Sequence, residues 1–512
     1  MKTNLLRSFL TVGGWTFGSR ILGFARDILM AGYLGAGPVA EAFVVAFSLP
    51  NMFRRFFAEG AFNMAFVPMF SKKWEKGEGA EDFARDAMAG LASVVLLLTL
   101  VAQLFMPALV LAMASGFRGD ERFDLAVEFG RITFPYIFFI SLAALISGAL
   151  NAMNRFAAAA AAPILLNIVF IAAMLGADFL GADIGKALVW AVPVAGIAQL
   201  ALVWVAADRA GLRLIPRMPQ MTPELKRLAK IAAPAILAGG VIQINLLIGR
   251  QVASQFDGAV AWLNYADRLY QLPLGVVGIA IGVVLLPDLS RRLAAQDVAG
   301  GRDAVNRAAE FSLALTVPAA VALIAIPVAL TSVLYQRGAF DFADSQATAL
   351  AVAVYGAGLP AFVLQKVLQP LFFAREDTRS PFRFALYAMI INLVLAIGLA
   401  PFIGFIAAAV GTTLAGWGMV WFLWRGSRAI GEEARIDERL KRKVPRIIAA
   451  SLGMGIASWG MATLMEPLLF GTSWRYPALA VLVFASIAVY AALTVLTGAM
   501  TPADLKKFLR RG

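Results

Sequence analysis

The sequence predicts an all-α polytopic membrane protein with fourteen transmembrane helices, and three observations lead to this fold class. The chain of 512 residues is 60% hydrophobic, with a mean hydropathy of +0.77, whereas soluble domains are roughly 45–50% apolar. Fourteen apolar runs can be counted, each long enough, at about 20 residues, to cross the roughly 30 Å of bilayer hydrocarbon. Most basic residues also fall in the connections on one side of these runs.

The apolar runs define the predicted spans in chain order. The first run follows Lys2 and Arg7, as in a secretory signal peptide, but it is too long and contains Arg20, so we expect a retained first helix. The second and eighth runs contain Pro50 and Pro273, and we expect each to be bent or broken there. The spans are expected at residues 8–34, 38–70, 86–114, 124–150, 157–176, 187–207, 231–255, 259–289, 309–333, 346–373, 381–400, 403–424, 445–465 and 475–499.

The distribution of basic residues predicts the orientation, because Lys and Arg are enriched in cytoplasmic loops. With the N-terminus in the cytoplasm, and with basic residues near the span ends counted in the adjoining segments, 32 of the 45 Lys and Arg residues belong to the inner segments and seven to the spans. Six belong to the outer segments: Arg118, Arg122, Lys186, Arg250, Arg337 and Arg475. Both termini are therefore expected in the cytoplasm. Most of the net charge of +13 is explained by this asymmetry, together with attraction to anionic lipid headgroups.

The two halves of the chain repeat each other in the same orientation. Four pairs of anchor residues are separated by 218–223 positions: Pro50 and Pro273, Ser71 and Ser290, Arg155 and Arg375, Pro163 and Pro381. Duplicated lobes around a central cavity are typical of transporters. The predicted organisation is an N-terminal six-helix lobe at 1–207, a basic cytoplasmic linker at 208–230, a C-terminal six-helix lobe at 231–424, a basic cytoplasmic loop at 425–444, and two final helices with a cytoplasmic tail at 445–512.

Two basic segments have the sequence pattern of a helix start. In "TPELKRLAK" (222–230), Thr222 is a candidate N-cap and Pro223 falls in the first turn. "TPADLKKFLRRG" (501–512) repeats the pattern. Two interpretations stay open for both segments: short basic helices on the inner membrane surface, or solvated loops.

Charged residues inside the spans are the candidates for a functional site, because a charge near the bilayer centre costs at least about 2.5–3.5 kcal/mol. Local ion pairs, such as Arg26 with Asp27, explain part of this set, but arginines outnumber carboxylates. The planar guanidinium group suits phosphate oxygens, so we expect a cationic cavity between the lobes and an anionic substrate. The candidate substrate-binding residues are Arg20, Arg26, Asp27, Glu41, Arg54, Arg55, Glu59, Asp267 and Arg268.

Other features limit the chemistry that the chain can perform. It contains no Cys and no His, which removes thiolate metal sites and the commonest general base. No nucleotide-binding or catalytic motif is found, so we expect no enzyme activity, no cofactor, no metal and no nucleic-acid partner. The intramembrane amides Asn167, Asn245, Gln365 and Asn392 are more simply explained as interhelical hydrogen-bonding groups.

Four stretches resemble the MurJ (MviN) family of lipid II flippases, within the multidrug/oligosaccharidyl-lipid/polysaccharide (MOP) exporter superfamily. They are "SRILGFARD" (19–27), "LPNMFRRFFAEGAFNMAFVP" (49–68), "NYADRLYQLPLGVVGIAIGVVLLPDLS" (264–290) and "FFAREDTRSP" (372–381). The resemblance covers essentially the whole chain. It implies two six-helix lobes plus two helices, and export of undecaprenyl-pyrophosphate disaccharide-pentapeptide across the bacterial inner membrane, for peptidoglycan synthesis, by alternating access.

The resemblance also implies roles for particular residues. The family's functional arginines correspond to Arg20, Arg26, Arg54 and Arg268, and its acidic position early in the second helix to Glu41. The implied partners are lipid II and membrane lipids, with cell-wall synthesis proteins as further candidates. Some members bind sodium through carboxylates on helices 7, 11 and 12. The spans 381–400 and 403–424 contain no Asp or Glu, which argues against that site here.

Three alternative functions stay open from the residues. A flippase for another polyprenyl-pyrophosphate-linked glycan would need the same cationic cavity, and only the motif match argues against it. A cation-coupled drug exporter of the same fold would call for a net acidic cavity. A membrane scaffold for cell-wall enzymes gives no reason for five arginines in the first, second and eighth spans.

Overall fold

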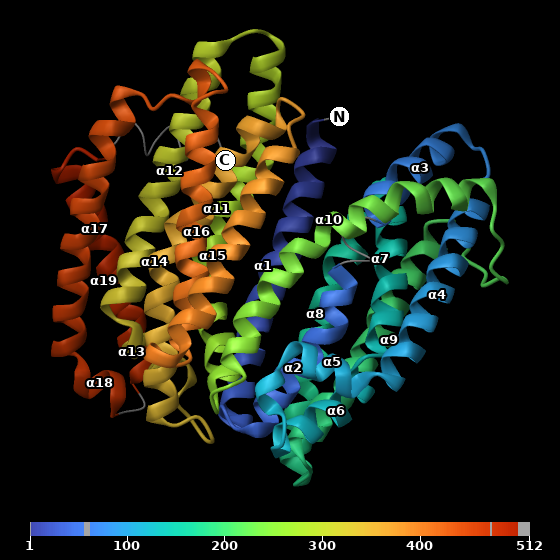
Figure 1. Cartoon of the computed structure of the whole chain (residues 1–512), viewed down its shortest axis with the longest axis horizontal. Helices are drawn as coiled ribbons and strands as arrows, with labels where there is room; N and C mark the ends of the chain where they lie inside the picture. Colours follow the sequence, from blue (N-terminus) through green and yellow to red (C-terminus); the bar gives the residue numbers. More distant parts are fainter. Residues whose placement is uncertain (1, 56–61, 472–473, 500–512) are drawn as a thin grey trace. The chain divides into compact units, whose positions relative to one another are not determined.

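The computed structural model describes residues 2–55, 62–471 and 474–499; within these, the side chains of residues 2–12, 62, 64, 233–242, 244 and 276–284 are not described. Across these ranges the regular structure is helical, apart from one isolated bridge between Arg337 and Phe340. The predicted all-α fold is therefore confirmed for the described ranges. Figure 1 shows the helices coloured along the chain.

Nine helices among the described residues are long and apolar enough to cross a membrane, and a tenth span results if α6 (Glu121–Thr133) and α7 (Tyr136–Ala152), bent by 41°, are counted together. The nine are α4 (Ala80–Leu104), α8 (Phe156–Leu180), α9 (Ile184–Arg209), α12 (Val298–Ala325), α14 (Phe342–Phe373), α15 (Arg379–Ile403), α16 (Ile406–Ser427), α17 (Glu438–Leu464) with the preceding 3-10 helix η3 (Glu432–Ala434), and α19 (Arg475–Leu496). The other four predicted spans also fall on helices, namely α1 (Lys2–Leu34), α2 (Pro38–Arg54) with α3 (Phe62–Lys76), α10 (Pro223–Ala253) and α11 (Ala259–Ala294). The number of fourteen transmembrane helices stays a prediction.

The chain divides into two compact units, residues 1–261 and 262–512. In the first unit α1 lies along α8, α2 along α6, and α8 along α9. Its helices are α1 (Lys2–Leu34), α2 (Pro38–Arg54), α3 (Phe62–Lys76), α4 (Ala80–Leu104), α5 (Met106–Met113), η2 (Ser115–Phe117), α6 (Glu121–Thr133), α7 (Tyr136–Ala152), α8 (Phe156–Leu180), α9 (Ile184–Arg209) and α10 (Pro223–Ala253).

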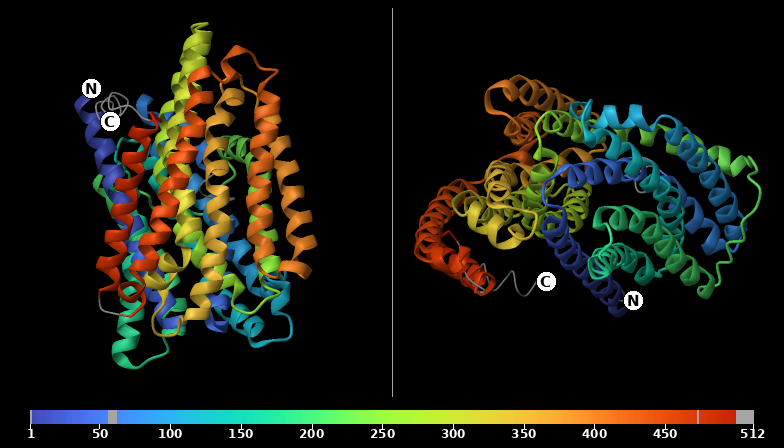
Figure 2. Two further views of the ribbon diagram at one scale, coloured as in Figure 1. Left: turned by 90° about the vertical axis from the view of Figure 1, so that its left-hand side faces the viewer. Right: turned by 90° about the horizontal axis from the view of Figure 1, so that it is seen from below.

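The second unit is a bundle of long helices that run side by side in both views of Figure 2. α14 packs on α12 and α16, while α17 packs on α12 and α19. Its helices are α11 (Ala259–Ala294, beginning just before the boundary), α12 (Val298–Ala325), α13 (Pro327–Tyr335), α14 (Phe342–Phe373), α15 (Arg379–Ile403), α16 (Ile406–Ser427), η3 (Glu432–Ala434), α17 (Glu438–Leu464), α18 (Glu466–Phe470) and α19 (Arg475–Leu496).

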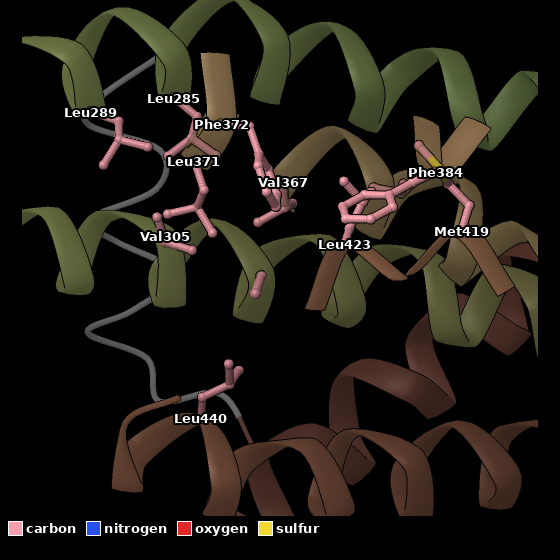
Figure 3. Packing of buried hydrophobic residues seen from close by; sticks show 12 residues of the cluster. Leu285, Leu289, Val305, Val367, Leu371, Phe372, Phe384, Met419, Leu423 and Leu440 are labelled. Atoms are coloured by element: carbon pink, nitrogen blue, oxygen red, sulfur yellow. The ribbon is translucent and has the colours of Figure 1, made fainter. Parts of the chain in front are cut away.

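The packing of the second unit is centred on buried side chains from α11, α12, α14, α15 and α16, to which the start of α17 contributes Leu440 (Figure 3). Leu289, Val367 and Leu371 are fully buried there. Many exposed side chains elsewhere are large and apolar, such as Phe179, Phe402 and Leu464. That pattern is expected where the surrounding solvent is lipid, because lipid tails are as apolar as the side chains that they cover.

Helix continues through the prolines in both spans that were expected to be bent or broken. α2 contains Pro50 and ends at Arg54, and the next described helix begins at Phe62. Residues 56–61 lie outside the described part of the chain, so the interruption of this span stays a prediction. α11 continues as helix through both Pro273 and Pro287. A break at Pro273 is therefore wrong, since a proline in a transmembrane helix is tolerated where neighbouring groups satisfy the freed carbonyl.

The linker segment 222–230 also differs from the prediction. Thr222 caps a helix as expected, its hydroxyl accepting the Leu225 amide at 3.2 Å, but the helix continues without interruption to Ala253. The solvated loop is wrong and the helical interpretation is confirmed, but the helix is not short, because the basic residues form the first turns of α10. Its place on the inner membrane surface stays a prediction. The second basic segment, 501–512, lies outside the described residues.

The far end of α10 is fixed to the first unit by polar contacts. The amide and hydroxyl of Ser115 both donate to Gln251 Oε1, at 2.9 and 2.6 Å. The Gly116 amide donates to Ser254 Oγ at 3.0 Å. A Cβ at Gly116 would lie 2.3 Å from the Ser254 carbonyl oxygen, so only glycine permits this approach. α10 therefore packs with the first unit, although the sequence repeat assigns it to the second lobe.

Candidate functional site

The charged residues of α1 differ in their surroundings. Arg20 is exposed, and among the described residues no hydrogen bond or ion pair is found for it. Arg26 and Asp27 are buried, at 9% and 3% exposure. Because six residues separate the two arginines, their Cα atoms lie about 9 Å apart along the helix axis, and only Arg26 points into the protein.

Arg26 is held by three neighbours. Its Nη2 and Nε donate to Asp27 Oδ1 at 2.7 and 3.1 Å, which confirms the predicted local ion pair. Its Nη1 donates to Asn167 Oδ1 on α8 at 3.0 Å. The guanidinium carbon lies 5.6 Å from the centroid of the Phe170 ring. Such a charge is buried but compensated.

Asn167 links α1 and α8 through both ends of its amide. Besides accepting from Arg26, it donates to the Ser19 carbonyl at 3.0 Å. Gly23 faces it, and a Cβ at that position would be 3.5 Å from the Asn167 Nδ2. The prediction that Asn167 is an interhelical hydrogen-bonding group is confirmed, and so is that for Gln365, which donates to the Gly416 carbonyl at 3.0 Å.

Glu41, in the first turn of α2, is engaged by the protein on both carboxylate oxygens. Oε2 accepts from Arg122 Nη1 at 3.1 Å, and Oε1 accepts from the Val260 amide at 3.0 Å. The side chain of Arg122 also pairs with Asp120 at 2.6 Å and Asp257 at 2.9 Å. Glu41 is thus a tie between the beginnings of α2, α6 and α11.

This group of charges was not predicted from the sequence, in which Arg122 counted only as an outer-side cation. A local signal was available in the spacing of Asp120 and Arg122, since Asp120 caps α6 by accepting the Arg122 amide at 2.7 Å. The ion pair between Arg122 and Glu41 joins residues 81 positions apart, and no local sequence pattern indicates it.

The remaining candidates lie elsewhere on their helices. Arg54 and Arg55 end α2; Arg54 is half-buried and Arg55 exposed. Glu41 and Arg54 are 13 residues apart on α2, about 20 Å along its axis, so they do not contact one small group together. Glu59 lies outside the described residues.

In the second unit, α11 carries the last two candidates. Asp267 accepts a hydrogen bond from the Gln271 side chain one turn further along. Arg268 is half-buried. The structure thus places cationic groups at intervals along α1, the end of α2 and α11, and gives the carboxylates Asp27, Glu41 and Asp267 protein partners.

Comparison with known proteins identifies the family. A family model described as "Lipid II flippase MurJ" matches residues 30–478 of this chain. The chain belongs to the lipid II flippase MurJ family. The "Probable lipid II flippase MurJ" of Rhizobium tropici is 44% identical over 522 residues, covering 99% of this chain and 97% of the relative. The "Lipid II flippase MurJ" of Burkholderia cenocepacia is 38% identical and covers 78% and 79%.

Solved structures agree with this assignment. One described as "Lipid II flippase MurJ, inward closed conformation" matches with a TM-score of 0.79 at 25% identity, covering 95% of this chain and 98% of that one. A MATE family transporter of the MOP superfamily matches with a TM-score of 0.66 at 14% identity, covering 80% and 95%, and shows the shared fold. As a MurJ family member with many apolar helices, the chain is a multi-pass transporter of the bacterial inner membrane and not an enzyme.

Proposed function

We propose that this protein moves lipid II from the inner to the outer leaflet of the cytoplasmic membrane by alternating access. The observation that carries the proposal is the 44% identity, over 99% of the chain, to a probable lipid II flippase. Lipid II carries a pyrophosphate, and phosphate oxygens are the acceptors that a guanidinium group binds best. The helical architecture with apolar spans supplies the membrane-crossing frame.

Within this proposal, the arginines differ in how readily they can bind the lipid II headgroup. Arg20 is exposed and has no ion-pair partner among the described residues, so its guanidinium group is available to a headgroup. Arg26 is already engaged by Asp27 and Asn167, and its exchange of partners would be part of the transport cycle. Arg54 and Arg268 are half-buried on α2 and α11 and are proposed to bind the same anionic headgroup during transport.

The test is complementation in a bacterium from which the native gene can be depleted. Lipid II is quantified in each leaflet with a membrane-impermeant reagent that reacts only with outer-leaflet lipid II. Depletion is expected to leave lipid II on the inner leaflet, and the wild-type chain to restore its export. Arg20→Ala is the decisive variant, because an exposed side chain can be removed without disturbing packing.

A hydrogen bond to a charged group contributes roughly 1.5–3 kcal/mol, so we expect Arg20→Ala to lower export by about tenfold or more. Arg291→Ala is the matched control, because the Arg291 side chain is 79% exposed and lies outside the candidate site. Normal export by Arg20→Ala at wild-type protein levels would contradict the assigned role. Normal leaflet distribution after depletion would contradict the function itself.

A further inference from the structure

Two arginines share one tyrosine at an end of the second unit. Arg337 lies in the turn between α13 and α14, and Arg475 is the first residue of α19. Their guanidinium carbons are 5.6 and 5.0 Å from the centroid of the Tyr476 ring. Both arginines belong to the six basic residues that the charge distribution predicts on the outer side of the membrane.

Neither arginine has a carboxylate partner among the residues that the structure describes. Arg475 donates from Nη1 to the Gln336 carbonyl at 2.9 Å and from Nη2 to the Tyr476 hydroxyl at 3.1 Å. Arg337 donates from Nη2 to the carbonyls of Val333 and Leu334 at the end of α13. The buried Nε of Arg337 has no acceptor within the described part of the chain.

The positive charges of Arg337 and Arg475 are not balanced by a carboxylate among the described residues. Burial lowers the pKa of Arg337, and the charge of Arg475 acts in the same direction. Arginine nevertheless stays protonated in proteins, so two neighbouring positive charges persist here with only neutral acceptors. A bound anion would supply the missing opposite charge and acceptors for the free N–H groups.

The surroundings indicate where such an anion would lie. Trp474, Tyr476, Phe342 and Phe470 are 67%, 45%, 44% and 42% exposed, and the last two rings meet edge to face at 6.4 Å. Exposed Trp and Tyr side chains are enriched at the level of lipid headgroups. Tyr476, against which both guanidinium groups lie, and the adjacent Trp474 are thus of the kind found at headgroup level, and with the predicted orientation this favours a position of the two arginines near outer-leaflet phosphates.

Apolar packing holds the segments that carry Arg337 and Arg475 in place. Buried side chains from α13, α18 and α19, including Val333, Leu469 and Leu482, form one apolar cluster. The turn that carries Arg337 and the start of α19 are thus fixed against each other before any ligand arrives. A preformed site loses less entropy on binding than a flexible one.

We propose that Arg337, Arg475 and Tyr476 form a second anion site, which binds the phosphate group of a lipid at the outer membrane surface. The site is separate from the nine candidate residues of the transport pathway. The same chemistry fits two sources, the phosphodiester of an anionic phospholipid and the pyrophosphate of a polyprenyl-linked product. The proposal rests on the predicted orientation but not on the transported substrate.

The experiment uses the absence of cysteine in the chain. Ala339 is exposed in the same turn as Arg337, and Ala339→Cys in the full-length protein is labelled with an environment-sensitive dye. Dioctanoyl phosphatidylglycerol, farnesyl pyrophosphate and phosphate-free dioctanoylglycerol are titrated in neutral detergent at fixed ionic strength. Arg337→Gln and Arg475→Gln are compared with Arg118→Gln, which removes an exposed outer-side cation of the first unit.

We expect both site variants, but not Arg118→Gln, to weaken binding of a phosphate-bearing probe by about tenfold or more. If the site variants bind only phosphatidylglycerol more weakly, the natural ligand is a phospholipid. If they bind only farnesyl pyrophosphate more weakly, the ligand is a polyprenyl-linked product. Weaker binding of both probes indicates a general phosphate site. Unchanged affinities for both probes would overturn the proposal, as would an equal response to dioctanoylglycerol. Because Arg337 also caps α13, thermal unfolding is recorded, and Arg475→Gln alone decides the outcome if Arg337→Gln does not fold.

Discussion

Arg26 shows how a single buried charge is accommodated within the first unit. Its charge is balanced by the adjacent Asp27 and its remaining donors are directed to Asn167. Removing one member of such a group leaves another buried without a partner, which costs more than the bond itself contributes. Asn167 is therefore important although it carries no charge.

We predict that Asn167→Ala destabilises the first unit and lowers transport. The substitution leaves Arg26 Nη1 and the Ser19 carbonyl without their acceptor and donor. Interhelical hydrogen bonds in membrane proteins contribute about 0.6–2 kcal/mol, and an unsatisfied buried group adds roughly 1–3 kcal/mol. A loss of about 1–3 kcal/mol is expected, measured as a lower thermal midpoint in detergent.

Asn151→Ala is the control, because Asn151 is exposed near the end of α7. Its thermal midpoint should match that of the wild type. If Asn167→Ala unfolds at the wild-type temperature, the amide does not stabilise the α1–α8 contact. The position of Arg26 in a long apolar helix was predictable from the sequence, but its partner, 141 positions away, was not.

At the scale of elements, local sequence predicts how several helices begin. Aspartate side chains cap α6, α9, α12, α14 and α17, and Thr222 caps α10. A cap needs only a side-chain oxygen and an amide two or three residues later, so it can be recognised in one short stretch. Where a helix ends depends on its distant neighbours, which is why the length of α10 was not predicted.

We predict that Thr222→Ala frays the first turns of α10 without changing the rest of the unit. Loss of a threonine cap costs about 1 kcal/mol. Hydrogen exchange of the amides of residues 225–230 should then speed up by roughly fivefold. Thr463→Ala serves as the control, because its hydroxyl donates to the Trp459 carbonyl within α17 and caps no helix. Equal exchange in the two variants would show that the cap does not hold this end.

At the scale of the whole molecule, the all-helical class and the positions of the apolar helices were predictable, because hydrophobic length is a local property of the sequence. The sequence repeat predicted duplicated lobes, but it did not predict the unit with which α10 packs. Its sequence position matches the first helix of a second lobe, yet Gln251 and Ser254 fix it to η2 of the first unit. A sequence repeat shows that two segments are related, but the helices with which each segment packs depend on its own side-chain contacts.

The orientation is the remaining prediction at this scale. Because the chain has no cysteine, single cysteines can be placed at exposed positions 218 and 435 for the cytoplasmic side and at 118 and 339 for the outer side. A membrane-impermeant maleimide added to intact cells should label only 118 and 339. Labelling of 218 or 435 from outside would reverse the assigned orientation.

The pairing of Arg26 with Asp27 has a consequence for the electrical work of the transport cycle. A charge that moves across the membrane potential exchanges about 2.3 kcal/mol per 100 mV. The pair carries opposite charges on adjacent residues, joined at 2.7 Å, so it moves almost no net charge as long as it stays intact. Under the proposed function, the voltage therefore acts on Arg20, Arg54, Arg268 and the bound headgroup, and on Arg26 only when a substrate phosphate separates it from Asp27.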